Sequence, residues 1–137
     1  MAKTVLVVDD VPFVRSTLKE ILSAAHFQVV GEASDGHEAV SLFTKLKPDF
    51  VTMDVVMPNM SGIEATRAII KLDKSARIFM VSAMGQENLV MEAINSGAKD
   101  YILKPFSAAD ILKTFERASE DLAPGTRRPG RESRAGG

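Results

Sequence analysis

The stretch Thr4-Val5-Leu6-Val7-Val8-Asp9-Asp10 sets the fold, because four consecutive apolar residues lead straight into two carboxylates. A strand that is apolar on consecutive positions is covered on both faces, as in a parallel sheet. Similar short runs recur along the chain. We expect five strands, over Thr4–Val8, Gln28–Glu32, Phe50–Met53, Arg77–Ser82 and Lys99–Leu103.

The segments between and after these runs carry apolar residues at spacings near three and four, which is typical of amphipathic helices. We expect five helices, over Pro12–Ala25, Gly36–Lys47, Gly62–Leu72, Gln86–Ser96 and Ser107–Asp121. Pro12 suits a first helical turn, Gly97 a left-handed helix end, and Ser107 with Asp110 a helix cap. Alternating strands and helices predict an α/β fold, a doubly wound open sheet with helices on both faces.

Size and composition are those of one ordinary globular domain. The chain has 137 residues, of which 45% are hydrophobic and 26% charged. The absence of cysteine excludes disulfides and thiolate metal sites. No apolar run suits a signal peptide or reaches the roughly 18 residues of a membrane span, so we expect a cytoplasmic protein without membrane insertion.

Charge divides the chain into two parts. Residues 1–122 carry 13 Lys and Arg against 17 Asp and Glu, a net charge of −4, whereas residues 123–137 carry four Arg and one Glu, a net charge of +3. An acidic body offers no electrostatic footprint for DNA. We therefore expect a folded domain over residues 1–121 and a disordered basic tail over residues 122–137.

The residues that follow the expected strands carry the chemistry. In an open parallel sheet, ligands bind beyond the carboxyl ends of the strands. Asp9 and Asp10 follow the first run, Asp54 follows the third, Ser82 ends the fourth, and Lys104 follows the fifth. The second run ends in Glu32, for which the pattern indicates no role. Topology therefore predicts that three carboxylates, a hydroxyl and an amine converge on one rim.

Three close carboxylates need a cation or protons. At about 4 Å and an effective dielectric near 20, each pair costs on the order of 4 kcal/mol. Oxygen ligands without His or Cys favour a hard ion such as Mg²⁺. With a cation present, Lys104 and Ser82 could contact phosphate oxygens while Asp54 acts as a nucleophile.

Each of these residues also has an ordinary explanation. Asp9 and Asp10 could cap the first helix, Asp54 could begin a turn, Ser82 could be a strand-end hydroxyl, and Lys104 could be a solvated surface charge. Their joint placement on successive strands is what favours a functional site.

As a set, the quoted motifs resemble the receiver domains of two-component response regulators. The resemblance rests on the ordered motifs Val-Asp-Asp, Met-Asp-Val-Val-Met-Pro-Asn-Met-Ser-Gly, Val-Ser-Ala and Lys-Pro-Phe, and it runs from about Lys3 to Asp121. Ser82-Ala-Met-Gly-Gln and Ala98-Lys-Asp-Tyr-Ile are most similar to single-domain chemotaxis regulators of the CheY type.

The resemblance implies a flavodoxin/CheY-like (βα)5 fold with the known strand order 2-1-3-4-5. It also implies roles for individual residues, beginning with Asp54 as the phosphoacceptor. Asp10, Asp54 and the Val56 carbonyl would bind Mg²⁺ directly, and Asp9 would act through a water. Ser82 would be the switch hydroxyl and Lys104 the phosphate contact. The bond before Pro105 would be cis, and Tyr101 would turn inward when Ser82 moves.

By the same resemblance, a sensor histidine kinase would supply the phosphoryl group. Output would pass to a downstream protein, for example a flagellar motor switch protein, since only 16 residues follow Asp121. We expect a monomer. Candidates for the partner face, which could equally be an ordinary solvated surface, are Met91, Glu92, Asn95 and Lys99. The only catalysis expected is self-phosphorylation of Asp54 and slow autodephosphorylation, because Val56 and Met84 are apolar where many relatives are polar.

Three alternatives stay open. The chain could be a phosphorelay intermediate or a regulator of another process. A Mg²⁺-dependent aspartyl phosphatase would need a second acid two residues after its nucleophile, where Val56 stands. A flavodoxin-like electron carrier would need a phosphate-holding loop after the first strand, but Asp9 and Asp10 would repel phosphate.

Overall fold

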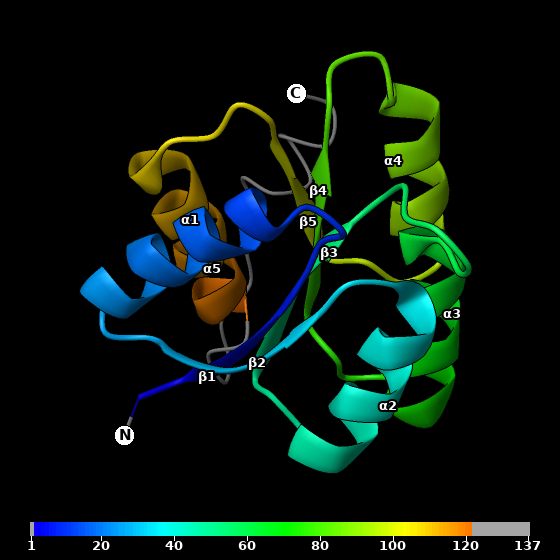
Figure 1. Cartoon of the computed structure of the whole chain (residues 1–137), viewed down its shortest axis with the longest axis horizontal. Coiled ribbons are helices and arrows are strands. Elements are labelled where there is room, and N and C mark those ends of the chain that lie inside the picture. Colours follow the sequence, from blue (N-terminus) through cyan, green and yellow to red (C-terminus); the bar gives the residue numbers. More distant parts are fainter. Residues whose placement is uncertain (1, 122–137) are drawn as a thin grey trace.

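In the computed structural model, which describes residues 2–121, five strands and five helices alternate along the chain (Figure 1). The strands are β1 (Thr4–Val8), β2 (Gln28–Ala33), β3 (Phe50–Asp54), β4 (Ile78–Ser82) and β5 (Asp100–Leu103). The helices are α1 (Pro12–Ala24), α2 (Gly36–Leu46), α3 (Gly62–Leu72), α4 (Glu87–Asn95) and α5 (Ala108–Asp121). The strands pair in parallel in the order β2-β1-β3-β4-β5, which confirms the expected α/β fold.

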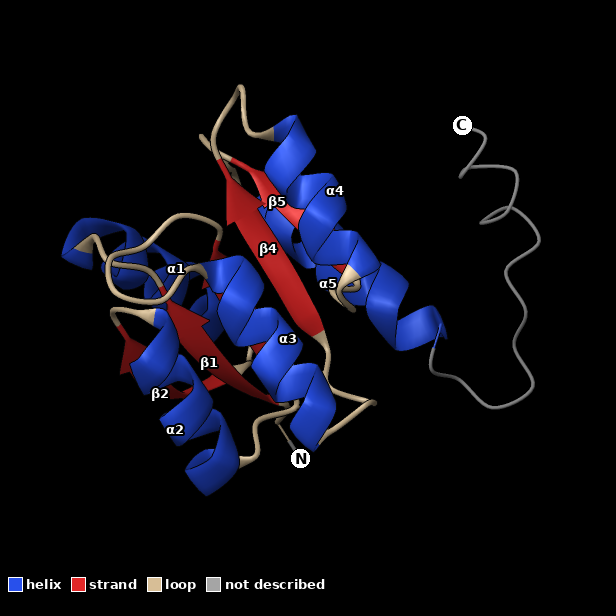
Figure 2. Cartoon of the chain, turned by 90° about the vertical axis from the view of Figure 1, so that its right-hand side faces the viewer, coloured by secondary structure: helices blue, strands red, loops and turns tan. Residues whose placement is uncertain are grey.

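Helices cover both faces of the sheet. Figure 2 shows α2, α3 and α4 in front of the strands, with α1 on the other side. Because the strands are parallel, the loops that leave their carboxyl ends lie along one edge of the sheet, with those after β4 and β5 at the top of Figure 1. This edge is where the sequence predicts the functional side chains to meet.

Helix ends agree with the local signals in the sequence, and no expected boundary differs from the observed one by more than one residue. Pro12 occupies the first turn of α1. Gly97, just beyond α4, has a φ of 121°, in the left-handed region that favours glycine. The Asp110 N–H donates to Ser107 Oγ at 3.1 Å, and the Ser107 N–H donates to Asp110 Oδ2 at 2.9 Å. Ser107 thus caps the last helix as expected.

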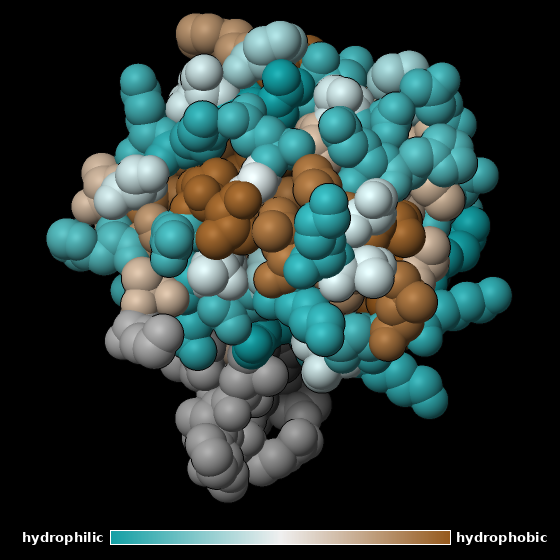
Figure 3. Space-filling model, turned by 60° about the horizontal axis from the view of Figure 1, so that its bottom comes forward, coloured by the Kyte–Doolittle hydropathy of each residue, from teal (hydrophilic) through white to brown (hydrophobic). Residues whose placement is uncertain are grey.

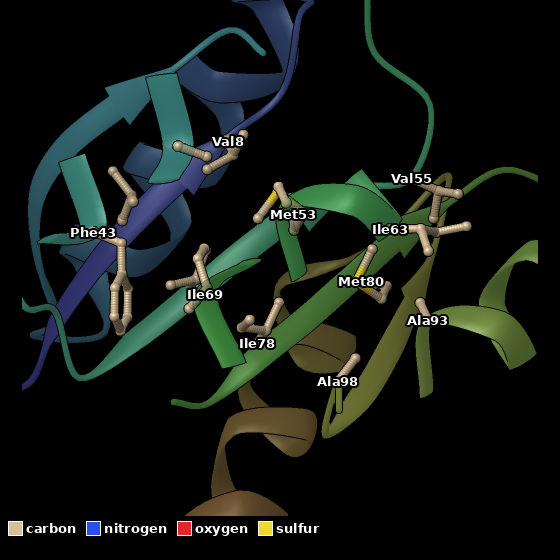
Figure 4. Close-up of a cluster of buried hydrophobic side chains, with 14 of the residues drawn as sticks. Val8, Phe43, Met53, Val55, Ile63, Ile69, Ile78, Met80, Ala93 and Ala98 are labelled. Atoms are coloured by element: carbon tan, nitrogen blue, oxygen red, sulfur yellow. The ribbon is translucent and has the colours of Figure 1, made fainter. Parts of the chain in front are cut away.

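Each face of the sheet has its own apolar core. The core beneath α2, α3 and α4 is aliphatic and methionine-rich, and Figure 4 shows Met53, Ile69, Ile78 and Met80 converging there. The core beneath α1 and α5 is aromatic. Four rings pack there with centroids 4.6 to 6.0 Å apart, namely Phe27, Phe50, Phe79 and Phe115. The sheet is packed between these two cores, which hold the ends of its strands in place.

The face at the amino ends of the strands is mostly hydrophilic, with apolar patches near its centre (Figure 3). A hollow there is lined by Phe43 and Thr44 of α2, Leu72 of α3, and the neighbouring Lys47, Pro48 and Asp73. Among residues 2–121, none of the helices has the length and hydropathy needed to span a bilayer. The basic tail expected over residues 122–137 lies outside the described residues.

Candidate functional site

The three carboxylates converge at the carboxyl edge of the sheet. One oxygen each from Asp9, Asp10 and Asp54 lies within 4.8 Å of the other two. Strands β1 and β3 are neighbours with Val8 opposite Met53, so the next residue of each strand reaches the same level. Asp9 is completely buried, Asp54 is 6% exposed, and Asp10 is exposed. The cluster therefore opens to solvent on its Asp10 side.

Lys104 brings a positive charge to this cluster. Its Nζ lies 3.3 Å from Asp9 Oδ2 and 3.5 Å from Asp54 Oδ1. The Lys104–Pro105 peptide bond is cis, and the Lys104 N–H donates to the Ser82 carbonyl at 2.7 Å. Lys104 thus connects the end of β5 both to the acidic cluster and to the end of β4.

Burial makes the Asp54 carboxylate hard to ionise. Its removal from water, together with the nearby Asp9 charge, raises the pKa of Asp54 to about 7, against the opposing effect of Lys104. The single ammonium of Lys104 therefore does not compensate the cluster fully. A further cation would stabilise the ionised form of Asp54.

The donor set fits a hard divalent ion. Asp9 Oδ1 accepts a hydrogen bond from the Val11 N–H at 2.9 Å, whereas the buried Asp9 Oδ2 accepts none from residues 2–121 and has only the ion-pair contact with Lys104 at 3.3 Å. Carboxylate oxygens that converge without His or Cys are ligands suited to Mg²⁺. Val56 is the second residue of the loop after β3, and its side chain is half exposed. The cluster can therefore hold Mg²⁺.

The loop after β3 folds back tightly on the strand that carries Asp54. The Gly62 N–H donates to the Val55 carbonyl at 2.9 Å, and a Cβ on Gly62 would overlap the Asp54 carbonyl oxygen. Ser61 and Glu64 form a complete capping box at the start of α3. This close approach requires glycine at position 62. The sequence motif alone did not reveal that reason.

The hydroxyl and the aromatic ring predicted to switch lie on neighbouring strands. Ser82 is buried at the end of β4, and Tyr101 of β5 is 49% exposed. A hollow of about 180 Å³ is lined by both residues, together with Ala83, Glu87, Val90, Met91 and Leu103. The Tyr101 side chain therefore lies half in solvent beside a hollow bordered by Ser82.

The residues proposed for a partner face lie on or just after α4 and are exposed. Met91 is 57% exposed, and Glu92, Asn95 and Lys99 are also at the surface. Glu92 has an intramolecular partner, since Arg67 Nη2 lies 2.8 Å from its Oε2. A larger groove of about 440 Å³ runs along β5 and α5, with Tyr101 in its lining.

Two polar residues near the cluster carry a role that the sequence did not reveal. Arg15 of α1 donates from Nη1 to the Asp9 carbonyl at 2.7 Å and from Nε to Glu32 Oε1 at 2.9 Å. The only available signal was an arginine one helical turn beyond Pro12 and an acid near the end of β2. Spacing alone does not pair them.

Comparisons with known proteins agree with this geometry. The model of the response regulator receiver domain family matches residues 5–116. The chemotaxis protein CheY of Thermotoga maritima is 48% identical over 120 residues, covering 88% of this chain and 100% of that protein. The Bacillus subtilis CheY is 47% identical over 117 residues, covering 85% of this chain and 98% of that protein.

Solved structures of CheY and CheB receiver domains are similar to this chain as well. A chain of the CheX–CheY–BeF3–Mg²⁺ complex from Borrelia burgdorferi superposes with a TM-score of 0.82 at 37% identity, covering 85% of this chain and 89% of its own. The response regulator domain of Thermotoga maritima CheB superposes with a TM-score of 0.81 at 40% identity, covering 90% of this chain and all of that domain. The chain therefore belongs to the response regulator receiver domain family.

Proposed function

We propose that this receiver domain is a chemotaxis response regulator that accepts a phosphoryl group on Asp54. The observation that carries the proposal is the buried Asp54 carboxylate, which lies beside Asp9 and Asp10 and 3.5 Å from the Lys104 ammonium. Its chemotaxis role is supported by the similarity to CheY proteins over nearly their whole length.

In the proposed reaction, an Asp54 carboxylate oxygen attacks phosphorus in line. The new P–O bond forms as the bond from phosphorus to the donor's imidazole nitrogen breaks, and the imidazole leaves with a proton from solvent. Lys104 stabilises charge on the transferred oxygens. Asp9, Asp10, Asp54 and the Val56 carbonyl would hold Mg²⁺, which when bound lowers the repulsion between phosphoryl oxygens and carboxylates.

The phosphoryl group then biases the segment around Ser82. It adds up to about two negative charges and three acceptor oxygens. Ser82 and Lys104 supply donors for those oxygens, and the hollow beside Ser82 offers room for the Tyr101 ring to turn inward. Phosphorylation thereby favours one of two conformations at the exposed surface of α4 and β5.

The proposed partners are a sensor histidine kinase as donor and a downstream target protein. A flagellar motor switch protein is the target we propose, with Met91, Glu92, Asn95 and Lys99 in the contact surface. The CheX–CheY complex is an example of a CheY protein assembled with a partner protein. We also propose that this chain acts in the cytoplasm and as a monomer.

Intact mass spectrometry tests the proposed acceptor. The full chain is incubated with acetyl phosphate and Mg²⁺, and we expect a gain of about 80 Da, the mass of one phosphoryl group. The gain disappears in Asp54→Asn and persists in the control Asp73→Asn, which changes an aspartate outside the cluster. A gain that survives in Asp54→Asn would refute the assignment.

The lifetime of the phosphoryl group provides a second test. Val56 and Met84 are both exposed and apolar, and neither can orient an attacking water. We expect slow loss of phosphate from the purified protein, measured by the decay of the added mass after the phosphodonor is removed. Val56→Asn should shorten the lifetime, whereas a half-life of seconds in the unaltered chain would contradict the expectation.

A further inference from the structure

A polar network behind the acidic cluster connects α1, the end of β1 and β2. The Arg15 guanidinium donates from Nη1 to the Asp9 carbonyl at 2.7 Å and from Nε to Glu32 Oε1 at 2.9 Å. Its side chain is only 18% exposed. One planar group thus bridges the main chain of the site and a neighbouring strand.

Glu32 keeps both of its carboxylate oxygens engaged in this network. Arg15 contacts Oε1, and Lys19 Nζ lies 2.8 Å from Oε2. Hydrogen bonds from Lys19 and Arg15 lower the pKa of Glu32, so its carboxylate stays ionised at neutral pH. The negative charge of Glu32 therefore balances the guanidinium within the network.

The contact with the Asp9 carbonyl matters because this peptide plane leads directly into Asp10. The Asp9 N–H donates to the Ala33 carbonyl at 3.0 Å, and the Asp9 carboxylate accepts from the Val11 N–H at 2.9 Å. Arg15 adds a third attachment, at the carbonyl. Together these contacts fix the short turn that aims two acidic side chains at Asp54.

A guanidinium that contacts the Asp9 main chain could, in another rotamer, pair with carboxylates of the cluster in competition with a metal ion. The Arg15 guanidinium instead donates to Glu32 and to the Asp9 main chain. Glu32 thus holds the Nε edge of the guanidinium on the side of β2.

We propose that Arg15 is a positioning residue for the acidic cluster and that Glu32 holds the Arg15 guanidinium away from its carboxylates. The proposal rests on the proposed function, because it concerns how the same site binds Mg²⁺ and reacts at Asp54. Arg15 acts through the Asp9 main chain and does not itself contact the reacting atoms.

The test compares Arg15→Ala, Arg15→Lys, Glu32→Gln and the control Lys19→Gln in the full chain. Three quantities are measured: the Mg²⁺ Kd by calorimetry, the rate of mass gain from acetyl phosphate at saturating Mg²⁺, and the thermal midpoint. Loss of residues that orient metal ligands weakens metal binding by about 10- to 100-fold. We expect Arg15→Ala to raise the Kd about tenfold and to slow phosphorylation, and Arg15→Lys to restore part of both.

Glu32 and Lys19 separate positioning from simple bracing. Glu32→Gln should raise the Mg²⁺ Kd because the released guanidinium turns toward the cluster. The same change made on top of Arg15→Ala should add little, since no guanidinium is left to compete. Lys19→Gln removes only the outer partner of Glu32 and should leave the Kd within about twofold.

The outcomes are distinguishable. If Arg15→Ala and Arg15→Lys lower the thermal midpoint but bind Mg²⁺ and react like the unaltered chain, Arg15 is only a structural brace and the proposal is overturned. If Glu32→Gln weakens Mg²⁺ binding equally with and without Arg15, the competition is refuted. If the unaltered chain neither binds Mg²⁺ nor gains mass, the proposed function itself fails.

Discussion

The loops that follow β3 and β4 leave neighbouring strands of one sheet, yet they are held very differently. After β3, a capping box at Ser61 and the packing of Gly62 on the Asp54 main chain fix the loop, and Asn59 Nδ2 donates to Asp35 Oδ2 at 2.9 Å. After β4, α4 begins without a side-chain cap at Gln86, although Gln86 Oε1 accepts from the Ala83 N–H at 2.7 Å within the loop. Among residues 2–121, no atom beyond Gly85 and its two chain neighbours lies within 4 Å of the place that a Cβ at Gly85 would take.

This difference matches the two tasks proposed for the site. The loop next to the proposed phosphoacceptor would have to keep a fixed geometry for transfer, whereas the loop next to Ser82 would have to reach a second conformation. Helix α4 is instead attached through its later turns, where Arg67 of α3 contacts Glu92 and donates from Nε to Ser96 Oγ at 3.1 Å. The loop before α4 is held instead by hydrogen bonds within itself, such as that from the Ala83 N–H to Gln86 Oε1.

The largest predicted effect concerns the buried carboxyl of Asp54, at the end of β3. The folded pKa of Asp54 is raised to about 7 from an ordinary value of 3.8, so the folded state holds a proton that the unfolded state has lost. In metal-free protein, this contribution to the free energy of unfolding is complete below about pH 4 and is lost as the pH rises through 7. Asp54→Asn should remove this loss, which amounts to at most about 4 kcal/mol.

Urea unfolding in EDTA at several pH values between 5 and 8 measures this effect as the difference between the two proteins. Ionisations common to both cancel in that difference. Addition of Mg²⁺ at pH 8 should stabilise the unaltered chain more than Asp54→Asn. A difference that does not change with pH would contradict the prediction.

Two glycines compare the loops directly. Gly62→Ala should destabilise by about 3 kcal/mol, because its Cβ would overlap the Asp54 carbonyl oxygen. Gly85→Ala meets no neighbour and should cost only about 1 kcal/mol, from its left-handed φ of 92°. Urea unfolding measures the loss of stability in each variant. Equal losses in the free energy of unfolding at the two positions would contradict the proposed difference between the two loops.

Loss of the capping box that ends the loop after β3 should have a smaller effect on stability. The Glu64 N–H donates to Ser61 Oγ at 3.2 Å, and the Ser61 N–H donates to Glu64 Oε1 at 3.0 Å. Ser61→Ala should lower the free energy of unfolding by about 1 kcal/mol without changing the slope against urea. A cost near zero would mean that Gly62 alone holds the loop.

The smallest global effect is expected at α4. The side chains of Arg67 and Glu92 are both about half exposed, so Arg67→Gln should cost no more than about 1 kcal/mol in urea unfolding. Its local effect should be larger, as faster amide hydrogen exchange in α4 than in α3. Lys71→Gln, one turn further along α3, should leave α4 exchange unchanged. Exchange that rises equally in both helices would argue against a local attachment.

Much of the site follows from the sequence because consecutive apolar residues can only be buried on both faces of a sheet. Once the strands are parallel, residues such as Asp9 and Asp54 at their carboxyl ends must share one edge. Local signals also located helix ends, as at Pro12 and Ser107. Some boundaries moved by one residue, since hydrogen bonding rather than residue type ends a strand.

The sequence by itself thus determined the sheet, the convergence of the acids and the presence of Lys104 near them. Only the tertiary structure decided which side chains support that cluster and which attach α4 to α3. Arg15 meets Glu32 and Arg67 meets Glu92 across 17 and 25 positions of sequence, and Gly62 meets the Asp54 carbonyl. Residue spacing fixes which side of a helix a residue occupies, but the packing of whole helices on the sheet decides what that side touches.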